Sequence, residues 1–211
     1  MNMAYPIFVI ALVSYLLGNL NGSVCISNML KGEDVRTHGS GNAGLTNFFR
    51  SYGSWSTLLV LLTDGVKTVM ACLMGGLMLE PYGLSKEGMM LGAVAVSLGH
   101  DFPVLLGFRG GKGILSGFAA AMVIDWRIGL MILGVFVITF AITRYVSLSS
   151  VLGALTYIAG FVWLYHDRVW VMIGGIALGV LAIFMHRGNI ARLCKGTESK
   201  VHLIHRGLNK S

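Results

Sequence analysis

Three short stretches hold most of the residues in this chain that could do chemistry. They read RTHGSGNAGLTNFFR at 36–50, GHDFPVLLGFRGGKG at 99–113 and HRGNIARLCKG at 186–196. Each combines glycine and small polar side chains with lysine or arginine. Glycine lets the backbone bend and come close to a ligand, while amide, hydroxyl and cationic groups bind phosphate oxygens. The three stretches therefore predict anion-binding loops, provided that the fold brings them together.

The first stretch has the composition of an anion cradle. Its glycines, which free the backbone, are Gly39, Gly41 and Gly44. Its neutral hydrogen-bonding residues are Ser40, Asn42, Thr46 and Asn47, and its two terminal cations are Arg36 and Arg50. Its segment GSGNAG matches the dinucleotide fingerprint G-x-G-x-x-G in letters only, because that fingerprint needs a preceding strand within a βαβ unit. Apolar segments flank it here, so we do not predict a nucleotide-binding fold.

The second and third stretches add a lysine and a histidine to the candidate site. Gly110, Gly111, Lys112 and Gly113 directly precede an apolar segment. Exposed N–H groups at a glycine-rich turn before a helix bind phosphate, which we favour over a plain positive anchor at the membrane surface. In the third stretch, Asn189 accompanies His186, for which a hydrogen-bonding or acid/base role and a structural role are equally supported.

The rest of the chain is apolar and predicts an all-α, polytopic membrane protein. Of its 211 residues, 55% are hydrophobic and 12% are charged, whereas soluble domains carry about 25% charged residues. A bilayer core of about 30 Å needs roughly 20 apolar residues per helix. This length requirement predicts seven spans: 4–29, 55–79, 88–107, 113–125, 127–143, 147–165 and 168–186, of which 113–125 and 127–143 are short. We expect them to form one domain, 1–211. We expect the first to be retained rather than cleaved as a signal peptide.

Charge at the ends of the spans predicts their orientation. Of the 16 Lys and Arg residues, Lys86, Arg127 and Arg168 fall on one side and Lys67 lies within a span, which leaves 12 on the side of the C-terminus. The positive-inside rule then places the C-terminus in the cytoplasm and the N-terminus outside, with all three polar stretches on the cytoplasmic face. It also accounts for the net charge of +7 without a nucleic-acid partner. Asp64, one turn from Lys67, is expected to pair with it.

The groups that are missing from the sequence also restrict the chemistry. There is no cluster of carboxylates for Mg²⁺, no thiol beside a histidine, and the three cysteines lack the spacing of a zinc site. We therefore predict no metal and no cofactor. The reaction that remains is one of a phosphorylated substrate, driven by positioning and positive charge.

Together the three stretches resemble the motifs of the bacterial membrane glycerol-3-phosphate acyltransferases that use acyl-phosphate as donor. The family motifs resemble GSGN-x-G-A-TN-x-x-R, GH-x-FP-x-x-x-x-F-K-GGKG and HR-x-NI-x-R-L-x-x-G-x-E-x-K, and this chain reads GSGNAGLTNFFR, GHDFPVLLGFRGGKG and HRGNIARLCKGTESK. Order and spacing agree along the whole chain. Two departures are mild: Leu45 replaces the usual Ala and Arg109 the usual Lys.

The resemblance implies transfer of an acyl group from acyl-phosphate to the 1-hydroxyl of glycerol-3-phosphate at the inner face of the bacterial cytoplasmic membrane. It also implies contact with membrane lipid and with the enzyme that supplies acyl-phosphate. The catalytic residues implied are Ser40, Arg50, Lys112, His186 and Asn189, and the substrate-binding residues implied are Gly39, Gly41, Asn42, Thr46, Asn47, Gly110, Gly111 and Gly113.

Several points stay open at this level. Either the departing phosphate or His186 could take the proton of the acceptor hydroxyl, and either cradle could hold either phosphate. A transporter of a small phosphorylated anion and an inactive scaffold within a lipid-synthesis complex are the rival functions. No inverted repeat is visible, and the polar groups crowd one face of the membrane rather than its midplane, which disfavours the transporter.

Overall fold

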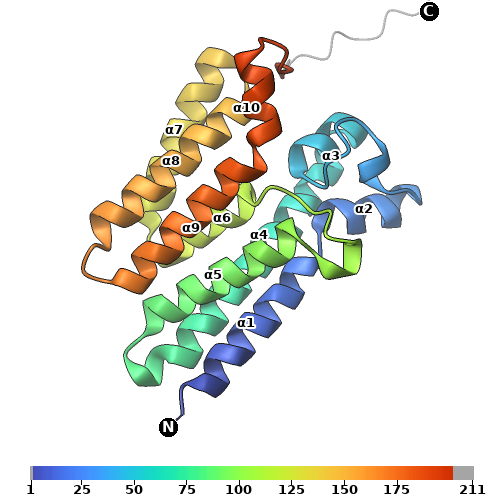
Figure 1. Cartoon of the computed structure of the whole chain (residues 1–211). Coiled ribbons are helices and arrows are strands. Elements are labelled where there is room, and N and C mark those ends of the chain that lie inside the picture. Colours follow the sequence, from blue (N-terminus) through green and yellow to red (C-terminus); the bar gives the residue numbers. More distant parts are fainter. Residues whose placement is uncertain (1, 202–211) are drawn as a thin grey trace, which may run out of the picture.

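The computed structural model describes residues 2–201, and within them the chain is helical without any β-strand. Figure 1 shows that the helices form one elongated bundle. The prediction of an all-α fold is confirmed. Arg206 and Lys210, which the charge count assigns to the C-terminal side, lie outside the described residues.

The long helices form two groups with a short helix between them (Figure 1). The first group contains α1 (Ala4–Asn19), α4 (Ser54–Leu79) and α5 (Ser85–Asp101), and the second contains α7 (Trp126–Thr143), α8 (Val146–Leu164) and α9 (Val169–Met185). The short helix α6 (Ile114–Ile124) contacts α4 and α5 on one side and α7, α8 and α9 on the other. Its residues Ala120, Ala121 and Ile124 are buried in the main apolar core.

Glycines let the helices of the first group approach closely. A Cβ on Gly75 of α4 would lie 2.0 Å from the Gly88 carbonyl of α5, and one on Gly99 would lie 2.1 Å from the carbonyl of Tyr15 on α1. Such distances exclude any side chain at these crossings. Small residues at helix interfaces are the usual means of association in lipid, where apolar burial between helices drives little.

Five helical segments are long and apolar enough to cross a membrane: Ala4–Lys31, Trp55–Tyr82, Ser85–Leu106, Trp126–Thr143 and Val146–Leu164. A sixth is formed if α9 and α10 (Arg187–Cys194), which meet at a bend of 55°, count as one span. α6 has only 11 residues, or about 17 Å of helix, which is short of a bilayer core. The count of seven spans stays a prediction.

α6 nevertheless reaches from one end of α5 to the other. At its start, a Cβ on Gly113 would lie 3.1 Å from Oδ2 of Asp101, the last residue of α5. At its end, the Ile124 carbonyl accepts a hydrogen bond from Nζ of Lys86, near the start of α5. The loop from Phe102 to Lys112 returns to the end of α5, where Gly110 and Gly111 donate to the carbonyls of Asp101 and His100, and α6 begins beside it.

The first predicted span, 4–29, falls within the candidate span Ala4–Lys31, and it consists of two helices with a break between them. α1 ends at Asn19, and α2 (Gly22–Lys31) begins after Asn21, whose side-chain Oδ1 accepts the N–H of Val24 at 3.1 Å. An asparagine N-cap of this kind starts a new helix. The third span, expected over 88–107, ends as a helix at Asp101 because Pro103 follows closely.

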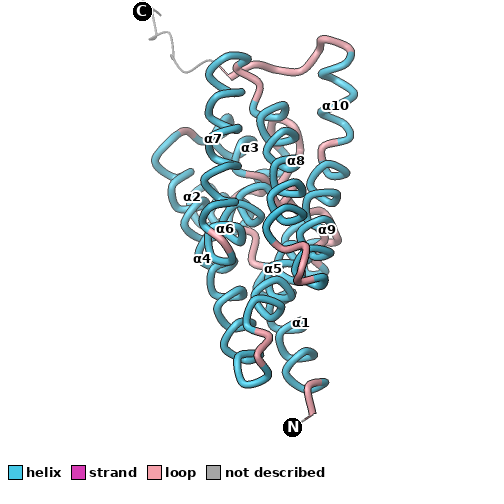
Figure 2. The backbone as a smooth tube through the Cα atoms, turned by 90° about the vertical axis from the view of Figure 1, so that its left-hand side faces the viewer, coloured by secondary structure: helices cyan, strands magenta, loops and turns pink. Residues whose placement is uncertain are grey.

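Short elements cover one end of the bundle beside α4. α2, the 3₁₀ turn η1 (Val35–Thr37) and α3 (Leu45–Tyr52) share a small apolar core that includes Val24, Val35, Phe48 and Val60. Figure 2, turned by 90°, shows the start of α1 and helix α10 at opposite ends of the molecule, in agreement with Figure 1.

Candidate active site

The three polar stretches line a single cavity of about 640 Å³. Nine of the thirteen predicted site residues are on its wall: Ser40, Asn42, Thr46, Asn47, Arg50, Lys112, Gly113, His186 and Asn189. Gly39, Gly41, Gly110 and Gly111 are not among the lining residues. The prediction that these three stretches, which lie far apart in the sequence, meet at one place in the fold is therefore confirmed.

In the first stretch, Asn47 holds the loop in shape. Its Nδ2 donates to the carbonyls of Val35, His38 and Asn42 at 3.0–3.1 Å, and its Oδ1 accepts the N–H of Ser40 at 2.8 Å. The side chain is buried, so its hydrogen-bonding groups are occupied by the backbone. Asn47 builds the loop and has little left to offer a substrate, which differs from the predicted binding role.

Gly39 and Gly41 also shape this loop rather than line the cavity. Both have positive φ, 56° and 69°, a region that side chains disfavour. A Cβ on Gly39 would meet Oδ1 of Asn47 at 2.3 Å. The side chains left to face the cavity are those of Ser40, Asn42 and Thr46, together with Arg50 in the last turn of α3.

In the second stretch, the glycines pack where we expected them to expose N–H groups. Gly110 and Gly111 donate their N–H groups to the carbonyls of Asp101 and His100 at 3.2 and 3.0 Å. A Cβ on Gly111 would lie 2.1 Å from Nε2 of His100. These two residues fasten the loop to the end of α5, so their predicted role as phosphate donors is not supported by the structure.

Lys112 follows this loop directly and lines the cavity with its cationic side chain. Its Nζ lies 2.5 Å from Oδ1 of Asn189, and the following residue, Gly113, caps α6 with φ 66°. Burial lowers the pKa of Lys112 from its ordinary value, and the nearby Arg192 adds to this effect. A phosphate beside it would favour the charged form.

The third stretch bends at His186, between α9 and α10. Nδ1 of His186 lies 2.8 Å from the Ala182 carbonyl one turn earlier, so this nitrogen carries the proton and Nε2 is left as an acceptor. The side chain is buried and lines the cavity. One turn later, Asn189 bridges Lys112 to Glu198 through Oδ1 and Nδ2, at 2.5 and 2.7 Å.

Comparison with known proteins places the chain in a family. Residues 8–196 match the family model described as glycerol-3-phosphate acyltransferase. The chain belongs to the glycerol-3-phosphate acyltransferase family. Proteins of that name from Thermoanaerobacter sp. (strain X514) and Clostridioides difficile (strain 630) are each 37% identical, over 90% and 93% of this chain and 93% and 96% of the relative.

Solved structures agree with the assignment to this acyltransferase family. The crystal structure of PlsY (YgiH), an integral membrane glycerol 3-phosphate acyltransferase, in its glycerol 3-phosphate form is 31% identical with a TM-score of 0.82. The match covers 93% of this chain and 96% of the other. Its lysophosphatidic acid form gives 29% identity and a TM-score of 0.78. This chain is accordingly a multi-pass membrane protein.

The candidate site contains two charged residues, Arg192 and Glu198, that the sequence analysis did not single out. Glu198 accepts hydrogen bonds from Nδ2 of Asn189 and Nε of Arg192, both at 2.7 Å, and its side chain is 6% exposed. Burial raises the pKa of Glu198, but these hydrogen bonds outweigh burial and hold it below the ordinary value. Both residues belong to the third family motif, so the signal was present in the sequence.

The segment after α10 forms part of the cavity wall in this family member. The Ser199 carbonyl lies 3.5 Å from Nη2 of Arg50, and the N–H of Val201 donates to the Arg144 carbonyl at 3.0 Å. Glu198 and Ser199 thereby become lining residues. The carboxylate of Glu198 lies among cations and amides, so this part of the candidate site accommodates an anionic group.

The predicted pair Asp64–Lys67 is confirmed beneath the first stretch. Lys67 Nζ lies 2.8 Å from Asp64 Oδ1, 3.0 Å from His100 Nδ1, and within 3.2 Å of the Gly18 and Leu20 carbonyls. Asp64 also accepts the Gly22 N–H at 3.0 Å. The pair joins the ends of α1 and α2 to α4 and α5, and Asp64 and His100 line the cavity.

The described part of this acyltransferase, residues 2–201, contains no group of three His, Cys, Asp or Glu side chains placed to hold a metal ion. The polar side chains that line the cavity are cations, amides, hydroxyls, the imidazoles of His100 and His186, and the carboxylates of Asp64 and Glu198. The cations, amides and hydroxyls can bind phosphate oxygens directly. The metal-free character of the reaction stays a prediction.

Proposed function

We propose that this protein transfers a fatty acyl group from acyl-phosphate to the 1-hydroxyl of glycerol-3-phosphate, giving lysophosphatidic acid and inorganic phosphate. The observation that carries the proposal is the meeting of Arg50, Lys112, Arg192 and Asn189 in one cavity. Donor and acceptor each bring a phosphate, so the reaction needs several cations and hydrogen-bond donors close together. Membership of the acyltransferase family supports the same assignment.

The cavity also has the apolar wall that a lipid substrate requires. Below the polar stretches it is lined by Phe118 of α6 and by Ile132, Leu133 and Phe136 of α7. An acyl chain can lie along these side chains while its activated phosphate stays among the cations. One cavity thus offers both a phosphate site and an apolar site, as donor binding needs.

In the proposed reaction, the acceptor hydroxyl oxygen attacks the acyl carbonyl carbon, and the bond from that carbon to the phosphate oxygen breaks. Acyl-phosphate is already activated, so positioning and charge stabilisation suffice and no protein nucleophile is needed. Lys112 and Arg50 hold the charge of the departing phosphate, which takes the proton. Nε2 of His186, free of the backbone, is the competing acceptor of that proton.

We further propose one domain, 1–211, with seven spans, the N-terminus outside and the C-terminus in the cytoplasm of a bacterial inner membrane. The start of α1 and helix α10 lie at opposite ends of the molecule (Figure 2), as an odd number of spans requires. The three stretches would then face the cytoplasm, where an enzyme that supplies acyl-phosphate can contact them.

Phosphate release from acyl-phosphate by the purified protein in detergent tests this function. We expect release to depend on glycerol-3-phosphate and lysophosphatidic acid to accumulate in equal amount. A transporter or an inactive scaffold would release no phosphate in response to the acceptor. Phosphate release without formation of lysophosphatidic acid would contradict the proposal. The absence of phosphate release from a protein that is shown to be folded by cooperative thermal unfolding would contradict it as well.

A further inference from the structure

Two Asp-x-Arg pairs in this chain have the same local geometry. Asp34 caps η1 and accepts the N–H of Arg36 at 2.9 Å as well as its Nε and Nη2 at 2.7–3.1 Å. Asp125 caps α7 and accepts the N–H, Nε and Nη2 of Arg127 at 2.6–3.0 Å. In both pairs the carboxylate fixes the plane of the guanidinium in front of a helix start.

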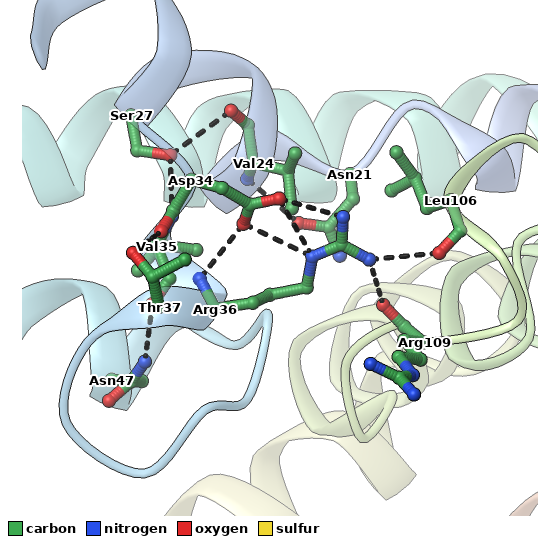
Figure 3. A network of polar contacts seen from close by, with 10 residues as sticks. All are labelled: Asn21, Val24, Ser27, Asp34, Val35, Arg36, Thr37, Asn47, Leu106 and Arg109. Carbon is green, nitrogen blue, oxygen red and sulfur yellow. Dashed lines mark hydrogen bonds and ion pairs between the residues drawn. The ribbon is translucent and has the colours of Figure 1, made fainter. Parts of the chain in front are cut away.

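Only Arg36 uses its remaining nitrogen to reach another part of the chain. Its Nη1 donates to the carbonyls of Leu106 and Arg109 at 2.9 and 3.0 Å, some 70 residues away, as Figure 3 shows. Arg127 has no such contact within residues 2–201, and its side chain is 57% exposed against 22% for Arg36. Arg36 was predicted to close an anion cradle; instead its guanidinium binds backbone.

The loop that Arg36 grips has an unusual turn. Gly107 and Phe108 both have positive φ, 64° and 60°, and the second is disfavoured for a bulky residue. Two successive left-handed residues lie between Leu106 and Arg109, whose carbonyls both meet the same guanidinium nitrogen. The contact with Arg36 is therefore part of what holds this conformation, and Lys112 follows three residues after Arg109.

On its own side, Arg36 is bonded into the first stretch. The carbonyl of the neighbouring Val35 accepts from Nδ2 of Asn47, and Oδ1 of Asn47 accepts the N–H of Ser40. The N–H of Val35 in turn donates to Oγ of Ser27 on α2 at 3.0 Å (Figure 3). Hydrogen bonds on both sides of the Val35–Arg36 peptide bond thus connect the loop before Lys112 to the backbone of Ser40.

We propose that Arg36 is a positioning residue that sets the distance between the Ser40 loop and Lys112 without touching substrate. The inference rests on the proposed function, in which these two parts of the cavity bind the reacting molecules together. Lysine cannot replace the guanidinium group of Arg36, because a single ammonium group cannot pair side-on with Asp34 and also donate to two backbone carbonyls. Displacements of about 1 Å between reacting groups are enough to lower rates by about a hundredfold.

Arg36→Ala and Arg36→Lys test the proposal, with Arg127→Ala as the matched control from the second Asp-x-Arg pair. We expect both Arg36 variants to raise KM for glycerol-3-phosphate by about tenfold and to lower kcat, and Arg127→Ala to leave both unchanged. Because KM does not depend on the fraction of active enzyme, a role in stability alone would lower the apparent kcat and leave KM as in the wild type.

The outcomes separate this inference from the proposed function. Wild-type protein that shows no acceptor-dependent phosphate release removes the function itself. Active wild type with unchanged KM in both Arg36 variants overturns the positioning role. If Arg36→Ala does not fold, Arg36→Lys decides, and a wild-type KM in that variant also overturns the role. An equal rise of KM in Arg127→Ala would show a general response to losing such a pair and would overturn it as well.

Discussion

Replacing Lys67 by methionine is the sharpest test of the buried pair beneath the site. The ammonium group of Lys67 serves Asp64, two backbone carbonyls and His100 from a side chain that is 5% exposed. Methionine keeps the apolar stem and removes the charge. The substitution leaves the Asp64 carboxylate buried with the Gly22 N–H as its remaining close donor, and leaves the Gly18 and Leu20 carbonyls without their partner.

The size of the effect follows from this loss. Removing one partner of a buried ion pair lowers the free energy of unfolding by about 3–5 kcal/mol, because the other charge stays uncompensated. For a chain of this size, 1 kcal/mol corresponds to about 2–4 °C in Tm, so we expect a fall of about 6–20 °C. The double variant Asp64→Asn/Lys67→Met removes both charges and should lose less than Lys67→Met alone.

Thermal unfolding in detergent, followed by the fluorescence of the tryptophans, gives the Tm of the three variants and the wild type. The cycle formed by Asp64→Asn, Lys67→Met and the double variant isolates the coupling between the two side chains. A Tm for Lys67→Met within about 2 °C of the wild type, or a double variant that loses the sum of the single losses, would show that the pair is not a compensated buried charge pair.

Three further predictions concern the cavity. Asn47→Asp keeps the acceptor for Ser40 but sets a carboxylate against three carbonyls, so we expect kcat/KM at least tenfold below that of the wild type; activity equal to the wild type would contradict the role of Asn47 in building the loop. Because burial lowers the Lys112 pKa, kcat/KM should fall as pH rises through a value below 10.5, and Lys112→Arg, whose side chain stays charged, should move that fall upward in a pH profile. His186→Ala should lower kcat less than tenfold and raise KM if phosphate takes the proton, whereas a loss above a hundredfold in single-turnover rates would make His186 the base.

The positions of the long helices could be predicted well from the sequence, because the length of an apolar run reports directly on the thickness of the bilayer core. The spans expected over 55–79, 127–143 and 147–165 differ from α4, α7 and α8 by no more than one residue at either end. The first span, 4–29, falls within one candidate span, Ala4–Lys31, but the helix break inside it was not predicted, although Asn19, Asn21 and Gly22 stand at the break. At Asn21 a side chain caps a new helix, and Lys67 satisfies the carbonyls that the break leaves open.

Residue types identified which stretches form the site, but they could not show how each polar group is used. Glycine next to lysine is compatible with an exposed N–H cradle and with close packing against a helix end. The structure decides for packing at Gly110 and Gly111, since both N–H groups donate to α5. The amino-acid sequence does not show which carbonyl lies opposite a backbone amide. It therefore could not distinguish an exposed N–H cradle from packing against the end of α5.

The general reason lies in the surroundings of these loops. Where little water reaches, each unpaired backbone carbonyl is costly, so side chains with several donors bind the backbone first. Asn21, Arg36 and Asn47 all do so, donating to the carbonyls of Ala43, of Leu106 and Arg109, and of the loop itself. Ser40, Asn42 and Thr46 have no side-chain hydrogen bond to another residue of the described chain, although they line the same cavity. The groups available to substrate are therefore the short side chains and the long cations, held in place by the polar residues between them.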